Sequence, residues 1–156
     1  MRHFKFAATA AAAAIAVLAT PVSAQTAGAS HAEALRKLDI MLMVTSLRCR
    51  TTADNFQADY QRFSSNNLAA LNAAARALQA DMVRHSGAQG ARRALDRISV
   101  GMANEYGRGH PWLGCGELKS ITRDLASGRD SVQLAAVASE LLSAKPLGRW
   151  AMAAAR

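Results

Sequence analysis

The sequence predicts an all-α fold, a single-domain bundle of about five helices closed by one disulfide. Apolar residues recur at spacings of three and four along most of the chain, which is the period of an amphipathic helix. No useful length of sequence alternates between apolar and polar residues, and β-branched residues are few, so strands are not expected. The chain also has two cysteines, Cys49 and Cys115.

Residues 1–24 have the features of a secretory signal peptide. Arg2 and Lys5 form a short basic start, residues 7–19 are apolar, and small residues precede Gln25. A transmembrane helix needs about 20 apolar residues, and this run is shorter. We therefore expect cleavage after Ala24, a periplasmic or secreted protein, and one helical domain over residues 25–156.

The predicted mature chain is basic. The full sequence has 19 Lys and Arg against 11 Asp and Glu, a net charge of +8. Loss of Arg2 and Lys5 leaves 17 basic residues against 11 acidic ones, a charge of +6. The bases are spread along the chain and its aromatic residues are scattered, so no nucleic-acid partner is expected. The sequence does not identify a partner: the candidates are an anionic envelope component or a protein, and the alternative is that the arginines on helix faces only keep an Ala-rich chain soluble. No mature segment is long enough to span a membrane.

Export makes a disulfide between Cys49 and Cys115 the first expectation, because the envelope is oxidising. The two cysteines are 66 residues apart. A loop of that length stabilises the fold by roughly 4 kcal/mol in the chain-entropy model. The sequence contains no C-x-x-C redox pair, no C-x-x-C-H haem site and no cluster of four zinc ligands, so neither a metal nor a cofactor is expected.

The first predicted helix begins at a capping box formed by Ser30 and Glu33 and ends near Cys49. Its apolar stripe follows helical spacing through Leu35, Leu38, Leu42, Thr45 and Cys49. Further apolar residues between these positions widen the stripe, so this helix is expected to be central and buried on most sides.

The next helical segment is expected to be capped by Asp54, with Gln57 as the partner of the cap, and to continue to Met82. Ser64-Ser65-Asn66-Asn67 interrupts it, since these side chains compete for backbone hydrogen bonds. The segment is therefore expected either to bend there or to form two helices. Gly87 and Gly90 predict a turn before the next helix.

Three shorter helices complete the predicted bundle. A helix over residues 91–106 ends at Gly107, and a loop then leads to Cys115, which begins the fourth helix one turn before Leu118. Gly128 is expected to terminate that helix. Asp130, paired with Gln133, is expected to cap the last one, which ends before Lys145-Pro146. The disulfide would join the end of the first helix to the start of the fourth.

The loop Gly107–Gly116, GRGHPWLGCG, concentrates most of the reactive chemistry. A dinucleotide-binding turn is excluded, because Trp112 occupies the position of its third glycine and no strand precedes it. A Cys115 nucleophile with His110 as its base would need a reduced thiol, which the disulfide removes. No G-x-S-x-G motif is present for a serine nucleophile.

Two interpretations of the loop remain. In the structural one, Gly107 supplies a left-handed helix stop and Trp112 fills the edge of the core. In the other, Arg108, His110 and Trp112 form a binding surface. An acid–base hydrolase using Glu105, His110 and Glu117 is the enzymatic alternative, since paired carboxylates can cleave glycosides. No residue is assigned a catalytic role.

Two segments, residues 38–72 and 95–126, resemble a group of small exported alphaproteobacterial proteins of unassigned function. The resemblance covers about half of the predicted mature chain and includes both cysteines. Some members of that group carry the name S-adenosyl-L-homocysteine hydrolase. That enzyme is large, cytosolic and dependent on a nicotinamide cofactor held by a G-x-G-x-x-G turn, so the present residues do not support adenosylhomocysteinase activity. In architecture alone, the chain is similar to small periplasmic acid-stress chaperones.

The expected function is therefore non-enzymatic, either binding or protection of the envelope under stress. The alternative is a small envelope hydrolase. An enzyme would need Glu105, His110 and Glu117 to point into one concave site, whereas a binding protein should offer an apolar or basic surface.

Overall fold

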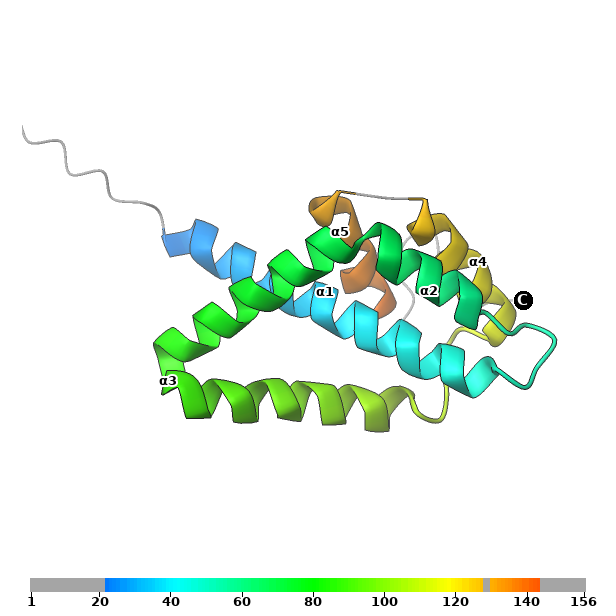
Figure 1. The fold of residues 1–156 in the computed structure, drawn as a ribbon, viewed down its shortest axis with the longest axis horizontal. Coiled ribbons are helices and arrows are strands. Elements are labelled where there is room, and N and C mark those ends of the chain that lie inside the picture. The colour runs from blue at the N-terminus through cyan, green and yellow to red at the C-terminus, as the bar shows by residue number, and fades with distance from the viewer. Residues whose placement is uncertain (1–21, 128–129, 144–156) are drawn as a thin grey trace, which may run out of the picture.

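A computed structural model describes residues 22–127 and 130–143, with side chains from residue 28 onward. Five helices make up the fold, and no strand occurs within these ranges (Figure 1). The helices are α1 (Val22–Cys49), α2 (Gln57–Asn66), α3 (Leu68–Tyr106), α4 (Cys115–Ala126) and α5 (Ser131–Leu141). The all-α prediction is confirmed. Gly128 and the predicted signal sequence up to residue 21 lie outside the described residues.

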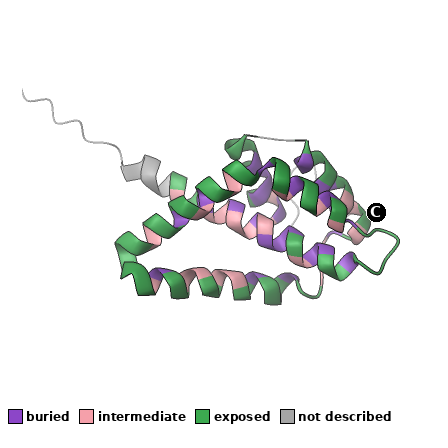
Figure 2. Ribbon diagram, viewed as in Figure 1, coloured by how far each residue is buried: buried purple, intermediate pink, exposed green. Residues whose placement is uncertain are grey.

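Helix α1 is the centre of the bundle and packs against each of the other four helices. Leu38, Met41 and Leu42 are completely buried, and purple residues run along this helix in Figure 2. Its predicted central position is confirmed. Its predicted start is wrong, because α1 begins at Val22 and Ser30 lies inside the helix with its side chain exposed.

Asn67, the last residue of the polar stretch, separates α2 from α3, which confirms the second of the two forms expected there. Asn66 Nδ2 donates to Ala126 O at 2.6 Å, and Asn67 Nδ2 donates to Leu125 O at 3.1 Å. The side chains that interrupt the helix thus satisfy carbonyls at the end of α4. The predicted cap at Asp54 is wrong, because Asn55 Oδ1 accepts the Gln57 N–H at 3.0 Å instead.

Helix α3 bends sharply at Gly87, whose φ of 67° and ψ of 172° are far from helical values. Two arms result, a first arm over residues 68–86 and a second arm over residues 88–106, joined at what we call the elbow (Figure 1). Gly90 remains helical, so the change of direction predicted for Gly87 and Gly90 occurs at Gly87 alone.

The short helices α4 and α5 complete the core. Cys49 and Cys115 form the predicted disulfide with their Cα atoms 5.8 Å apart, and it links the last residue of α1 to the first residue of α4. Asp130 caps α5 as predicted, since its carboxylate accepts the N–H groups of Val132 and Gln133 at 2.9 and 2.8 Å.

Candidate functional site

The loop between α3 and α4 turns at Gly109, not at Gly107. Gly107 keeps a right-handed conformation with φ of −61°, so the predicted left-handed stop at this position is wrong. Gly109 has φ of 115°, and its N–H donates to Tyr106 O at 2.9 Å. The helix ends at Tyr106, as predicted, and the glycine with positive φ lies two residues later than the sequence suggested.

His110 and Trp112 point inward and bind the end of α5. His110 Nε2 donates to Leu141 O at 2.8 Å, and Trp112 Nε1 donates to Ser143 O at 3.2 Å. His110 Nδ1 accepts the Trp112 N–H at 3.4 Å, which assigns the proton to Nε2. Their rings are 4.7 Å apart in an edge-on arrangement. These two side chains satisfy carbonyls that the end of a helix leaves without partners.

Burial lowers the pKa of His110, against opposing effects from its bond to Leu141 and from the charges of Glu105 and Glu117. Desolvation disfavours the imidazolium, so the ring is neutral at physiological pH. Both of its nitrogens are engaged in hydrogen bonds. The ring therefore has no free lone pair with which to accept a proton from a substrate.

The two glutamates of the hydrolase hypothesis have separate positions. Glu117 Oε2 accepts the Gly114 N–H at 2.8 Å and so caps the start of α4. Glu105 is exposed and lies beside Tyr106, where burial and then the glutamate raise the pKa of Tyr106 to about 12. Glu105 also lines a groove that includes neither His110 nor Glu117 among its walls.

Arg108 is the one member of the predicted binding loop that faces solvent. It is exposed and makes no ion pair with any described residue. His110 is buried and Trp112 is half-buried against the core. Arg108 faces solvent while His110 and Trp112 face the core, so the three side chains do not form one binding surface.

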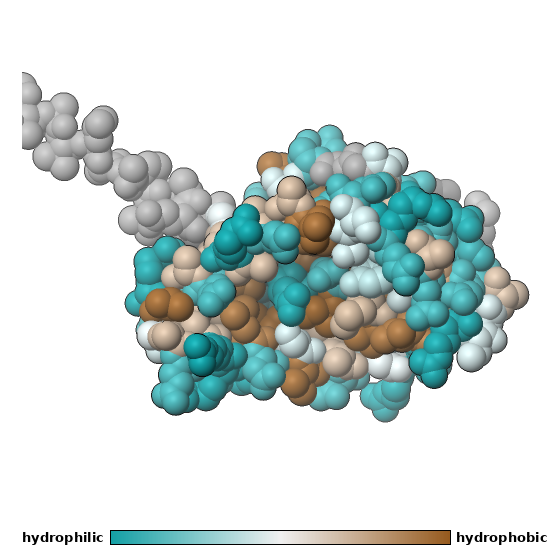
Figure 3. All heavy atoms as spheres, in the orientation of Figure 1, coloured by the Kyte–Doolittle hydropathy of each residue, from teal (hydrophilic) through white to brown (hydrophobic). Residues whose placement is uncertain are grey.

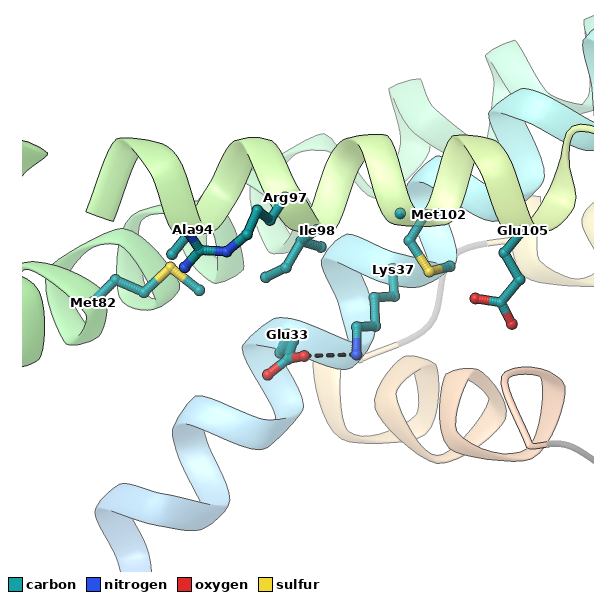
Figure 4. Close-up of a pocket in the computed structure, with 9 residues that line it drawn as sticks. Glu33, Lys37, Met82, Ala94, Arg97, Ile98, Met102 and Glu105 are labelled. Atoms are coloured by element: carbon teal, nitrogen blue, oxygen red, sulfur yellow. Dashed lines mark ion pairs between the residues drawn. The ribbon is translucent and has the colours of Figure 1, made fainter. Parts of the chain in front are cut away.

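A groove of about 470 Å³ lies between α1 and the two arms of α3 (Figure 4). We call it the α1–α3 groove. Its apolar lining consists of Met82, Ala94, Ile98, Gly101 and Met102. Its polar lining consists of Glu33, Lys37, Arg97 and Glu105. Figure 3 shows brown, apolar surface along the middle of the same face of the molecule.

The polar residues leave the centre of the groove apolar. Glu33 and Lys37 pair with each other along α1, with Oε1 and Nζ 2.6 Å apart. In Figure 4 the Arg97 side chain extends toward Met82, while Glu105 lies at the far end of the second arm. At Gly101, an added Cβ atom would meet no heavy atom within 4 Å. The missing side chain at this position keeps the groove open.

Sequence reasoning missed this groove. Met82 lies on the first arm and Met102 on the second, and only the bend at Gly87 places them on either side of one hollow. Two glycines were the signal in the sequence: Gly87, at which the helix bends, and Gly101, which leaves space on the second arm.

No cluster of three His, Cys, Asp or Glu residues able to hold a metal ion occurs among the described side chains. No helix in the part of the chain described is long and apolar enough to cross a membrane. Comparisons with models of known protein families, with curated proteins and with solved structures give no match. The resemblance to small exported proteins therefore stays a prediction.

Proposed function

We propose that this chain is an exported, non-enzymatic binding protein whose α1–α3 groove holds an apolar segment of another polypeptide. The observation that carries the proposal is the open apolar hollow that Gly101 maintains between α1 and the second arm. Apolar grooves bordered by a few charged groups are sites at which proteins commonly bind peptides.

The chemistry of the lining supports a peptide segment as the occupant. Met82 and Met102 have flexible, polarisable side chains, which suit surfaces that accept varied apolar partners. From Ala94 to Glu105 the groove extends for about 16 Å along the second arm, a length that about five extended residues span. Arg97 and Glu105 offer one charge of each sign to the polar groups of such a segment.

The contacts of the loop favour binding over hydrolysis. His110 and Glu117 use their polar atoms to cap α5 and α4, and of these three residues it is Glu105 that lines the groove. A general acid–base pair has to reach a common substrate atom, and the α1–α3 groove is lined by Glu105 without His110 or Glu117. No observation favours the envelope hydrolase as a second function.

The proposed site of action is the bacterial envelope, either the periplasm or the exterior. The predicted signal peptide supports it, and the Cys49–Cys115 disulfide is a kind of bond that persists in oxidising compartments. A protein that holds apolar polypeptide segments there would serve in protection of the envelope under stress.

Filling the groove tests the proposal. In Gly101→Trp the indole would occupy the hollow, because the space around the Cβ position is open. Val100→Trp is the matched control, since Val100 is 51% exposed on the same arm and does not line the groove. Binding of a fluorescent ten-residue peptide of Leu, Met and Lys is measured by anisotropy.

We expect Gly101→Trp to weaken peptide binding at least tenfold and Val100→Trp to leave it unchanged. Circular dichroism and thermal unfolding verify that both variants remain folded. Absence of peptide binding by the unmodified protein, or equal binding by both variants, would reject the groove as a peptide site.

A further inference from the structure

A second surface lies where the disulfide joins α1 to α4, at the opposite end of the molecule from the elbow (Figure 1). A cavity of about 360 Å³ opens here. It is lined by Val44, Leu47, Arg48, Arg50, Thr51 and Gly107. We call this cavity, together with the adjacent Met43 and Arg108, the disulfide corner.

Three arginines at the disulfide corner have no acidic partner among the residues that the structure describes. Arg48, Arg50 and Arg108 are exposed, and none forms an ion pair with a described residue. No carboxylate lines the cavity. Arg48 and Arg50 line the cavity, and Arg108 directly follows Gly107, which lines it too. Neighbouring cations with no described counterion favour an anionic ligand, and guanidinium groups match the geometry of phosphate oxygens.

Apolar side chains are exposed beside these cations. Met43 is 39% exposed and Leu47 is 44% exposed, although both lie on the helix that forms the centre of the core. Residues 43 and 47 lie on one row of α1, residues 44 and 48 lie on the adjacent row, and Arg50 and Thr51 follow directly in the turn after the helix. The apolar and basic groups therefore form one continuous face.

The fold holds this face rigid. Cys49 lies between Arg48 and Arg50, and its bond to Cys115 anchors that turn of the chain to α4. The Arg48 side chain crosses Gly109 so closely that an added Cβ atom would be 3.3 Å from Nε. Restricting the arginines before a ligand arrives lowers the entropy lost on binding.

The elbow of α3 also carries arginines, but its charges are partly neutralised. Arg84 Nη2 lies 2.7 Å from Asp81 Oδ1, and Asp96 lies between Arg93 and Arg97 along the second arm. The α1–α3 groove, which reaches toward the elbow, contains Arg97 together with Glu33 and Glu105. Of the two basic regions, the disulfide corner is the one suited to a phosphate group.

We infer that the disulfide corner docks the protein on a membrane surface rich in anionic phospholipid. Headgroup phosphates would bind Arg48, Arg50 and Arg108, while Met43 and Leu47 would enter the boundary between headgroups and acyl chains. A soluble polyanion would use the arginines alone. The exposed apolar pair beside them is the observation that favours a bilayer.

Vesicle binding of the full mature protein tests the inference. Co-sedimentation with vesicles of phosphatidylglycerol and phosphatidylethanolamine is compared with co-sedimentation with phosphatidylcholine vesicles, at two salt concentrations. The test variant is Arg48→Gln, Arg50→Gln, Arg108→Gln. The matched control is Arg76→Gln, Arg92→Gln, Arg93→Gln, which removes three exposed α3 arginines that likewise have no described ion pair.

Each arginine near an anionic surface contributes roughly a fivefold factor in binding, so the test variant should bind on the order of 100-fold more weakly. The control variant should bind as the parent does, and neither should bind phosphatidylcholine. An equal loss in both variants would mean that overall charge alone attracts the protein, which would overturn the proposal.

The apolar pair separates a bilayer from a soluble polymer. Met43→Ser, Leu47→Ser should weaken vesicle binding at least fivefold and leave binding to soluble polyphosphate unchanged. Polyphosphate binding with no vesicle binding, or vesicle binding unaffected by the serine substitutions, would overturn the assignment to a membrane. These measurements do not involve the α1–α3 groove, so they stand independently of the peptide proposal.

Discussion

At the scale of the residue, Gly101 keeps the groove open but lowers the stability of the helix in which it lies. It lies inside the second arm of α3, where glycine is about 1 kcal/mol less favourable than alanine, and an added Cβ would meet nothing within 4 Å. We expect Gly101→Ala to raise the free energy of unfolding by about 1 kcal/mol, measured by urea denaturation.

Gly90 supplies the comparison for this prediction, because it lies in the same arm. A Cβ atom there would be 2.5 Å from the Ser86 Cβ atom across the bend. Gly90→Ala should therefore lower stability. If both alanine variants gained stability equally, the crowding inferred at the elbow would be wrong.

His110 gives the fold a defined dependence on pH. Burial places its folded pKa below the unfolded value of 6.5. Below pH 6.5 the unfolded chain therefore binds more protons than the folded one, and stability is lost as the pH falls toward the folded pKa. Above pH 6.5 the contribution of the neutral ring is complete.

The variant His110→Gln isolates this effect, since its amide can still donate to Leu141 O but does not titrate. We expect the free energy of unfolding to fall less steeply between pH 6.5 and 5 in the variant than in the parent. Burial raises the pKa of Asp39, which acts in the opposite direction, but this effect is common to both proteins. Parallel curves would show that His110 is not responsible.

At the scale of elements, the sequence predicted best those features that depend on neighbouring residues only, such as an apolar stripe or a helix cap. The stripe around Leu38 and Leu42 identified α1 as the central helix, and Asp130 identified the start of α5. Ser30 failed as a helix start because α1 already begins at Val22, so a good cap lies within a longer helix. Local capping signals mark a helix end only where the preceding residues do not continue the helix.

Contacts between distant elements were not accessible from the sequence. The Asn66 and Asn67 side chains were recognised as a helix break, but their bonds to the end of α4 span about 60 residues of chain. The bonds from His110 to Leu141 and from Trp112 to Ser143 likewise join residues that are 31 positions apart in the sequence. The candidate site depends on such pairings, because they determine which polar groups are already used.

The disulfide is the covalent link between α1 and α4, and its removal should act on the whole bundle. In the chain-entropy model, a loop spanning 66 residues contributes roughly 4 kcal/mol. We expect Cys49→Ala, Cys115→Ala to lower the free energy of unfolding by about that amount. A thiol assay on the non-reduced parent should find no titratable thiol, and detection of two would contradict the disulfide.

At the scale of the whole molecule, the two proposed surfaces lie on different parts of the bundle. The α1–α3 groove is formed by the middle of α1 and the two arms of α3, whereas the disulfide corner lies where α1 ends. A protein docked through Arg48, Arg50 and Arg108 would keep Ile98 and Gly101 clear of the contacts made by those arginines. Attachment to a membrane and capture of an apolar segment are therefore compatible in one molecule.

Export is the last property to test, because both proposals depend on the compartment. Cleavage after Ala24 would remove only the first three residues of α1, less than one turn, and the buried side chains described on this helix begin at Ala32. We therefore expect the exported protein to begin at Gln25 by intact mass, and to unfold at the same temperature as a chain that retains Val22–Ala24. Recovery of Met1 in the exported protein would contradict the signal peptide, and a lower unfolding temperature on cleavage would show that the start of α1 contributes to the core.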